Sequence, residues 1–101
     1  MPTKMFKPAE AFHPGDFLRD ELAERKLTQA AFAKAIGRPV QAINEIVNGR
    51  KSVTAETAKL IGAAFGTGPE LWLNLQTAYD LFHAPDPDPA VRKRVVALCG
   101  T

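Results

Sequence analysis

Glycines and prolines interrupt this chain of 101 residues so often that only short helices can form between them. Gly37, Gly49 and Gly66 each follow a segment with helical apolar spacing, and a glycine in that place ends a helix in a left-handed conformation. Three alternating prolines between residues 84 and 90 exclude a helix interior there. We therefore expect an all-α fold of five short helices with almost no sheet.

The expected helices begin at residues that suit the start of a helix. A proline is tolerated in the first turn, so Pro14 can open a helix that runs to about Lys26. Thr28 and Thr54 can each accept a hydrogen bond from a first-turn amide, and so cap the second and fourth helices. The five predicted ranges are 14–26, 29–36, 40–47, 55–65 and 69–83.

The two ends of the chain differ from this helical middle. Residues 1–13 have no sustained period, and we expect them to form an N-terminal arm before a helix-turn-helix domain at residues 14–83. Residues 84–101 are a proline-rich linker and tail, and alternating prolines favour a stiff extended chain. The valines of 91–99 suit a short extended tail, although the length and basic cluster of this segment also suit a short helix.

The third predicted helix separates two kinds of side chain. At ~100° per residue, its branched aliphatics share about 120° of arc and its polar residues about 100° on the opposite side. A solvated helix usually presents Lys and Glu, whereas carboxamides pair with adenine N6 and N7 in the major groove. This pattern indicates sequence-specific DNA binding, although a surface helix that carries amides by chance would also fit. The aliphatic set is Val40, Ile43, Ile46 and Val47, and the polar set is Gln41, Asn44, Glu45 and Asn48.

The middle of the chain is its most basic part. Residues 38–59 hold four basic and two acidic side chains, in a chain whose net charge is +2. Arg38 stands where the third helix begins and can reach a guanine or a phosphate. We expect Glu45 to be solvated or to pair with a neighbour such as Arg38 or Lys51, rather than to accept from cytosine. The predicted base-reading residues are Arg38, Gln41, Asn44 and Asn48, and the predicted phosphate-contacting residues are Gln29, Arg50 and Lys51.

The fifth predicted helix is apolar nearly all round, and such a helix needs burial on more than one side. A second chain could cover one side, and a two-fold dimer would place two reading helices about one DNA turn apart, ~34 Å. The alternative is that this helix is the central helix of a monomer. The tail at 91–98 is a second candidate for the dimer surface. The predicted dimer-interface residues are Trp72, Leu75, Tyr79 and Phe82.

Catalysis is not expected from this composition. The two histidines lie seventy residues apart, serine and cysteine each occur once, and no glycine-rich phosphate loop is present. We therefore expect no catalytic residue, no metal and no cofactor. No apolar run approaches the ~18 residues of a membrane helix. With a single cysteine and no secretory signal at the first residues, a reducing, cytoplasmic setting is expected.

Three motifs carry a resemblance to a known family. They are His-Pro-Gly at 13–15, Asn-Gly-Arg-Lys at 48–51, and Pro-Glu-Leu-Trp-Leu-Asn-Leu-Gln at 69–76. With the residues between them, they resemble HigA-type antitoxins, also described as VapI or addiction-module antidotes, within the phage-repressor-like (XRE) helix-turn-helix class. The resemblance covers about residues 13–82. It implies a five-helix fold of the lambda-repressor type.

The resemblance also implies partners and a function. Family members bind double-stranded operator DNA as homodimers, repress their own operon, and bind an mRNA-cleaving HigB-like toxin of a type II toxin-antitoxin module. It places the base-reading and phosphate-contacting roles on the residues named above. Pro39 departs from the family pattern, since many relatives have a small polar residue there. A stand-alone transcriptional regulator without a toxin, and an interaction module that no longer binds DNA, remain as alternatives.

Overall fold

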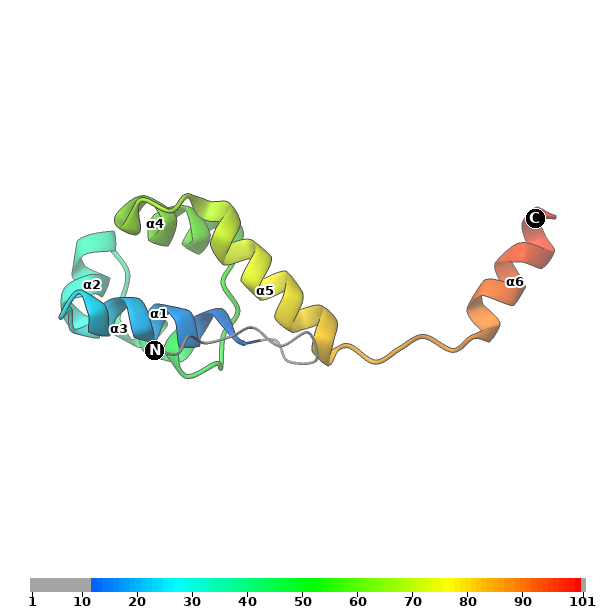
Figure 1. Ribbon diagram of the computed structural model, residues 1–101, viewed down its shortest axis with the longest axis horizontal. Helices are drawn as coiled ribbons and strands as arrows, with labels where there is room; N and C mark the ends of the chain where they lie inside the picture. The colour runs from blue at the N-terminus through cyan, green and yellow to red at the C-terminus, as the bar shows by residue number, and fades with distance from the viewer. Residues whose placement is uncertain (1–11, 101) are drawn as a thin grey trace.

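The computed structural model describes residues 12–100, and within them the chain forms six helices and no strand (Figure 1). The predicted ranges of the second to fifth helices are confirmed, while the first helix ends two residues earlier than expected. Most of the predicted N-terminal arm, residues 1–13, lies outside the described residues. The helices are α1 (Pro14–Glu24), α2 (Gln29–Ile36), α3 (Val40–Val47), α4 (Ala55–Phe65), α5 (Pro69–His83) and α6 (Ala90–Cys99).

The helices α1 to α5 enclose one apolar core. α4 packs along α5, α2 packs against α3, and α1 contacts both α3 and α5. The core therefore lies beneath α3, which sits between α1 and α2. Its buried apolar members are Leu18, Leu22, Phe32, Ala33, Ile43, Ile46, Val47, Val53, Ala58, Ile61 and Trp72.

The turn between α2 and α3 forms as the sequence predicts. The Thr28 hydroxyl accepts a hydrogen bond from the Ala31 amide at 3.0 Å and caps the start of α2. Gly37 ends α2 with φ +73°, a left-handed conformation that costs glycine little. Ala33 is buried at the α2–α3 contact, where its small side chain lets the two helices approach closely.

Trp72 corrects the prediction for the dimer surface. Its side chain has no exposed area, and its indole N–H donates to the Thr67 hydroxyl at 2.9 Å. Trp72 is therefore a core residue with nothing left to offer a second chain, because helical periodicity does not tell a core face from an interface. Leu75 and Tyr79 are partly buried and Phe82 is half exposed, so for these three the interface assignment stays a prediction.

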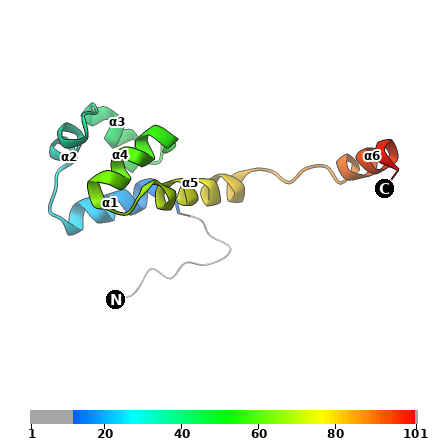
Figure 2. The same ribbon diagram turned by 90° about the horizontal axis from the view of Figure 1, so that it is seen from above.

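The tail also differs from the expected extended segment, because residues 90–99 form the helix α6. Residues 84–89 are irregular, as the prolines predict, and hold α6 away from the core in both ribbon views (Figures 1 and 2). The radius of gyration is accordingly 17.6 Å, whereas a compact chain of this length measures about 13 Å.

Among the described residues, no helix is long and apolar enough to cross a bilayer.

Candidate nucleic-acid interface

The two faces of α3 are arranged as predicted, apart from its first residue. Ile43, Ile46 and Val47 are buried, while the carboxamides of the predicted reading face are exposed. Val40 was expected on the buried face and is 48% exposed. It lies in the first turn, and the buried part of α3 begins only at Ile43. The reading face thus consists of Gln41, Asn44 and Asn48, with Glu45 partly buried beside them.

A row of hydrogen bonds joins three of the exposed carboxamides. The Asn48 side-chain N–H donates to Oδ1 of Asn44 at 3.1 Å. The Asn44 side-chain N–H in turn donates to Oε1 of Gln29 at 3.2 Å. The row therefore links the start of α2 to the end of α3 across the helix-turn-helix. It brings Gln29, predicted to contact a phosphate, beside two residues that are predicted to read bases.

Three cations lie beside this face, and two of them form exposed ion pairs. Arg38 pairs with Glu56 of α4, and Lys51 lies 3.7 Å from Glu45. The expected pairing of Glu45 with a neighbour is thus confirmed for Lys51 and not for Arg38. Within residues 12–100, Arg50 makes no ion pair. Exposed pairs contribute only about 0–1 kcal/mol, so phosphates can compete for these cations.

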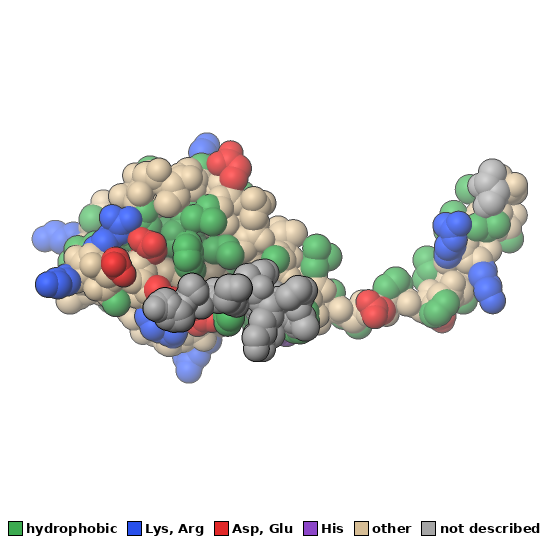
Figure 3. Space-filling model, viewed as in Figure 1, with side chains coloured by type: hydrophobic (Ala, Val, Ile, Leu, Met, Phe, Trp, Pro, Cys, Tyr) green, Lys and Arg blue, Asp and Glu red, His purple; other side chains and the backbone are tan. Residues whose placement is uncertain are grey.

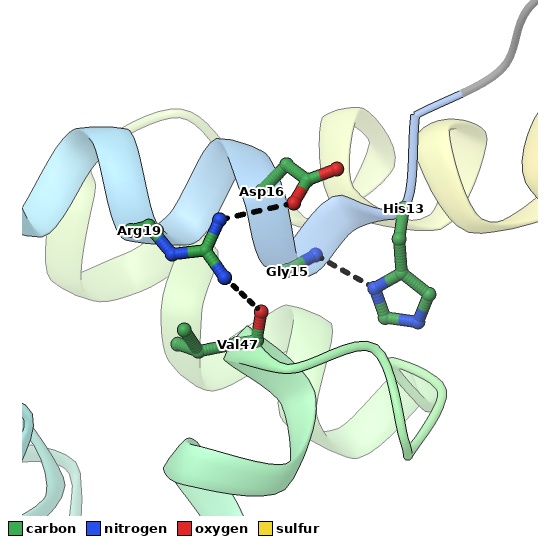
Figure 4. Close-up of polar contacts among 5 residues, drawn as sticks. All are labelled: His13, Gly15, Asp16, Arg19 and Val47. Carbon is green, nitrogen blue, oxygen red and sulfur yellow. Dashed lines mark hydrogen bonds and ion pairs between the residues drawn. The ribbon is translucent and has the colours of Figure 1, made fainter.

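The end of α3 is fixed to the start of α1 (Figure 4). Nη2 of Arg19 donates to the Val47 carbonyl at 2.9 Å, and Nη1 of the same guanidinium lies 3.2 Å from Oδ1 of Asp16. A Cβ placed on Gly15 would overlap the carbonyl group of Ile46. The first turn of α1 therefore lies directly on the backbone of α3, and a glycine is required at position 15. Sequence reasoning missed these roles of Gly15 and Arg19.

His13 connects three parts of this region. Its Nδ1 accepts a hydrogen bond from the Gly15 amide at 2.8 Å and so caps α1 (Figure 4). The ring packs edge-on against Tyr79 of α5 at 4.9 Å between centroids, and is buried. Burial lowers the pKa of His13, opposed by Asp16, Asp80 and the backbone of Lys51, which all favour the protonated ring. His13 was predicted to lie in the arm, but here it belongs to the core.

Gln76 holds the segment that follows α3. Its Oε1 accepts a hydrogen bond from the Val53 amide at 2.7 Å, and its Nε2 donates to Asp80 at 3.0 Å. The side chain is buried in α5. Sequence reasoning gave Gln76 no role beyond its place in the motif at 69–76, although it lies four residues after Trp72 and so on the same side of α5. Together, His13, Arg19 and Gln76 fix the end of α3 and the loop after it, while the carboxamides face outward.

Two short helices joined at a left-handed glycine, with an aliphatic face buried and a carboxamide face exposed, define a helix-turn-helix DNA-binding protein. The Helix-turn-helix family model (HTH_3) matches residues 18–72, which is more than half of the chain. These residues include the turn, the whole of α3 and the first part of α5. This class explains why the polar face of α3 stays free of the core, and it is not a class of enzymes.

Individual relatives narrow the class. Virulence-associated protein I of Dichelobacter nodosus is 46% identical over 72 residues, which cover 70% of this chain and 67% of that protein. A solved addiction module antidote of the HigA family from Coxiella burnetii has a TM-score of 0.71 at 36% identity, with 88% of this chain and 94% of that chain covered. Pseudomonas aeruginosa antitoxin HigA, solved with the higBA promoter, has a TM-score of 0.69 at 32% identity, with 90% and 88% covered. The chain belongs to the HigA-type antitoxin family of helix-turn-helix DNA-binding proteins.

Proposed function

We propose that this protein binds its own operator as a homodimer, represses its operon, and neutralises a HigB-like toxin by direct binding. The observation that carries the DNA-binding part is α3 itself. Its aliphatic side is buried in the core, Arg19 holds its C-terminal end, Gln76 holds the loop after it, and its carboxamide side is exposed. A rigid helix with free donors and acceptors can read base edges without a further ordering cost.

Within this proposal the residues divide into two roles. Exposed carboxamides on one side of α3 are in position to read base edges in the major groove, with Arg38 at the entrance of the helix. The start of α2 and the loop after α3 offer amide and cationic groups to the two phosphate backbones. The base-reading set is Arg38, Gln41, Asn44 and Asn48, and the phosphate set is Gln29, Arg50 and Lys51.

The toxin partner and the repression of an operon rest on the family. The solved structure of the Pseudomonas aeruginosa relative contains the higBA promoter, which supports operator binding by this chain. Antitoxins of this family imply a toxin as the second partner. Neutralisation would then be stoichiometric binding, because the helix-turn-helix class performs no catalysis.

The test has a DNA arm and a toxin arm. In the first, the purified protein is titrated onto a labelled duplex from its own promoter and onto a scrambled duplex of the same length and composition. Tighter binding to the promoter is expected, and equal binding to both duplexes would exclude a sequence-specific reader.

In the second arm, the protein is co-expressed with the neighbouring small reading frame, and the purified material is weighed by native mass spectrometry. A stable complex that also restores growth is expected. A neighbour that is neither toxic nor bound would leave a stand-alone regulator.

A further inference from the structure

The helix α6 carries an apolar stripe that no other part of residues 12–100 covers. Val91, Val95 and Leu98 are 43%, 50% and 85% exposed, and no residue of α6 is buried. Their spacing of four and three residues places them on one side of the helix. Figure 3 shows hydrophobic and basic side chains on the C-terminal helix, which stands apart from the core. We call these three residues the α6 stripe.

The linker keeps the α6 stripe away from its own core. Residues 84–89 contain three prolines at alternate positions, each with a restricted φ and no backbone N–H. A chain of this kind advances about 3.1 Å per residue and resists a tight reversal. α6 would have to double back immediately after His83 to reach the surface beside α5. A partner for the α6 stripe is therefore sought on another molecule.

An open cleft lies between the start of α1 and the end of α5. Its walls include His13, Asp16, Tyr79, Phe82 and His83, and it has a volume of about 500 Å³. Phe82 is 52% exposed at its edge. The cleft thus combines aromatic walls with the ion pair of Asp16 and Arg19, both of which line it. We call it the aromatic cleft.

We propose that α6 of one chain docks its stripe into the aromatic cleft of a second copy, and that the two copies exchange these helices reciprocally. This rests on the proposed dimer and names the surfaces that form it. Reciprocal exchange closes with two-fold symmetry, because each chain both donates a helix and accepts one. The cleft also borders Asn48 and Gly49 at the end of α3, so the partner lies beside the reading helix.

Charge supports a second copy as the occupant. α6 has three basic residues and no acidic one, a net charge of +3. α1 has four carboxylates and one guanidinium, a net charge of −3. At ~100° per residue, Arg92 and Arg94 flank the α6 stripe on opposite sides. There they can approach Asp80, whose charge acts on His13 of the cleft wall, and Asp16, where they would compete with Arg19 for an exposed ion pair. The three basic residues point in three directions, so they do not form one face that could follow a DNA backbone.

The test uses two full-length variants with opposite defects and one control. Val95→Asp with Leu98→Asp places two charges on the donor stripe, and Phe82→Asp places one charge at the edge of the acceptor cleft. Ala97→Asp adds one negative charge, as Phe82→Asp does, on the side of α6 away from the stripe, and serves as the control. Masses are measured by sedimentation equilibrium, and binding to a single operator half-site is measured on each protein.

Each defective variant should dimerise about 30-fold or more weakly, as expected when an apolar contact central to an interface is replaced, while Ala97→Asp should match the wild type. Mixing the two defective proteins should restore a heterodimer, because one intact stripe then meets one intact cleft. Half-site binding should be unchanged throughout. If the wild-type protein does not bind the half-site at all, the proposed DNA binding is refuted, while the proposed exchange of helices is not.

Three results would overturn the exchange. The first is a stripe variant that dimerises like the wild type. The second is a cleft variant that dimerises normally while the stripe variant does not, which would mean that α6 pairs with α6. The third is a stripe variant that stays dimeric but no longer co-purifies with the toxin, which would assign α6 to the toxin.

Discussion

α3 and α6 each carry an aliphatic stripe along one side, yet their surroundings differ. In α3, Ile43, Ile46 and Val47 are buried, and side chains from α1 and α5 hold the end of the helix and the loop after it. In α6, the stripe is exposed and a proline-rich linker holds it away from the core. α3 therefore presents its polar side to a partner, whereas α6 presents its apolar side. α3 offers polar groups from a position fixed by the core, while α6 offers apolar groups from a helix with no buried residue.

The largest effect is expected at Gly15, where α1 contacts the backbone of α3. Gly15→Ala places a methyl group against the Ile46 carbonyl, so α1 and α3 must separate, and the free energy of unfolding should fall by about 3 kcal/mol. Gly100→Ala is the control, because a Cβ there meets nothing, and the strain of an alanine at its φ of +74° falls on the end of α6, which does not support the core. The stability of both variants is measured by thermal melts. Equal losses of stability would mean that the start of α1 does not hold α3.

Asn44→Ala tests whether the exposed side of α3 reads DNA. Loss of its bidentate hydrogen bonds should weaken operator binding by about 2 kcal/mol and relax preference at one base pair. Asn74→Ala removes an exposed carboxamide from α5 and should leave operator affinity unchanged. Anisotropy titrations against operator duplexes with single base changes provide the measurement. An Asn44 variant with normal affinity and preference would remove this residue from the reading face.

His13 makes the anchoring of α3 dependent on pH. Its pKa is lowered in the folded protein, so the unfolded chain, with a pKa of about 6.5, binds the proton more readily. Stability from this group is therefore fully present above about pH 6.5 and is lost as the pH falls below that value. His13→Asn keeps a cap acceptor but does not titrate, and both proteins retain His83. Urea unfolding between about pH 7.5 and pH 5 should show a steeper loss for the wild type, and parallel curves would contradict this.

Arg50→Ala should have the smallest effect, because it removes one phosphate contact of the loop that His13 and Gln76 help to hold. Binding should weaken similarly on all sequences, and the slope of log affinity against log salt should fall by about one unit. Lys59→Ala removes an equal charge from the exposed side of α4 and serves as the control. If the slope is the same as that of the wild type, Arg50 does not contact the DNA backbone.

Local signals in the sequence predicted most of the fold. Thr28, Gly37 and Gly66 act within one turn of their own position, so the bounds of α2, α3 and α4 follow from the sequence. The conformation of 91–99 was left open between an extended tail and a short helix, because its valines favour strands, and the structure shows the helix. Trp72 was misplaced because an apolar helix face looks the same in a core and at an interface.

The outward face of α3 was predicted and the contacts that hold it were not. Arg19 reaches Val47 across 28 positions, and Gln76 reaches Val53 across 23. Each contact joins a side chain to a backbone group. Because every residue has a backbone, the sequence contains no matching pair of residue types that would predict such a contact. A single sequence could show which side of α3 is polar, but not what holds the helix from behind.

The hydrogen-bonded carboxamides of Gln29, Asn44 and Asn48 have a direction, because each has a donor end and an acceptor end. Gln29→Lys would present only donors to Asn44, so Asn44 would turn its oxygen toward α2 and its N–H₂ toward Asn48. Asn48 would then have to turn as well, and the row would show the major groove a reversed order of polar atoms. Under the proposed base-reading role of Asn44 and Asn48, operator preference would therefore change through Gln29 of α2, a residue that need not touch a base.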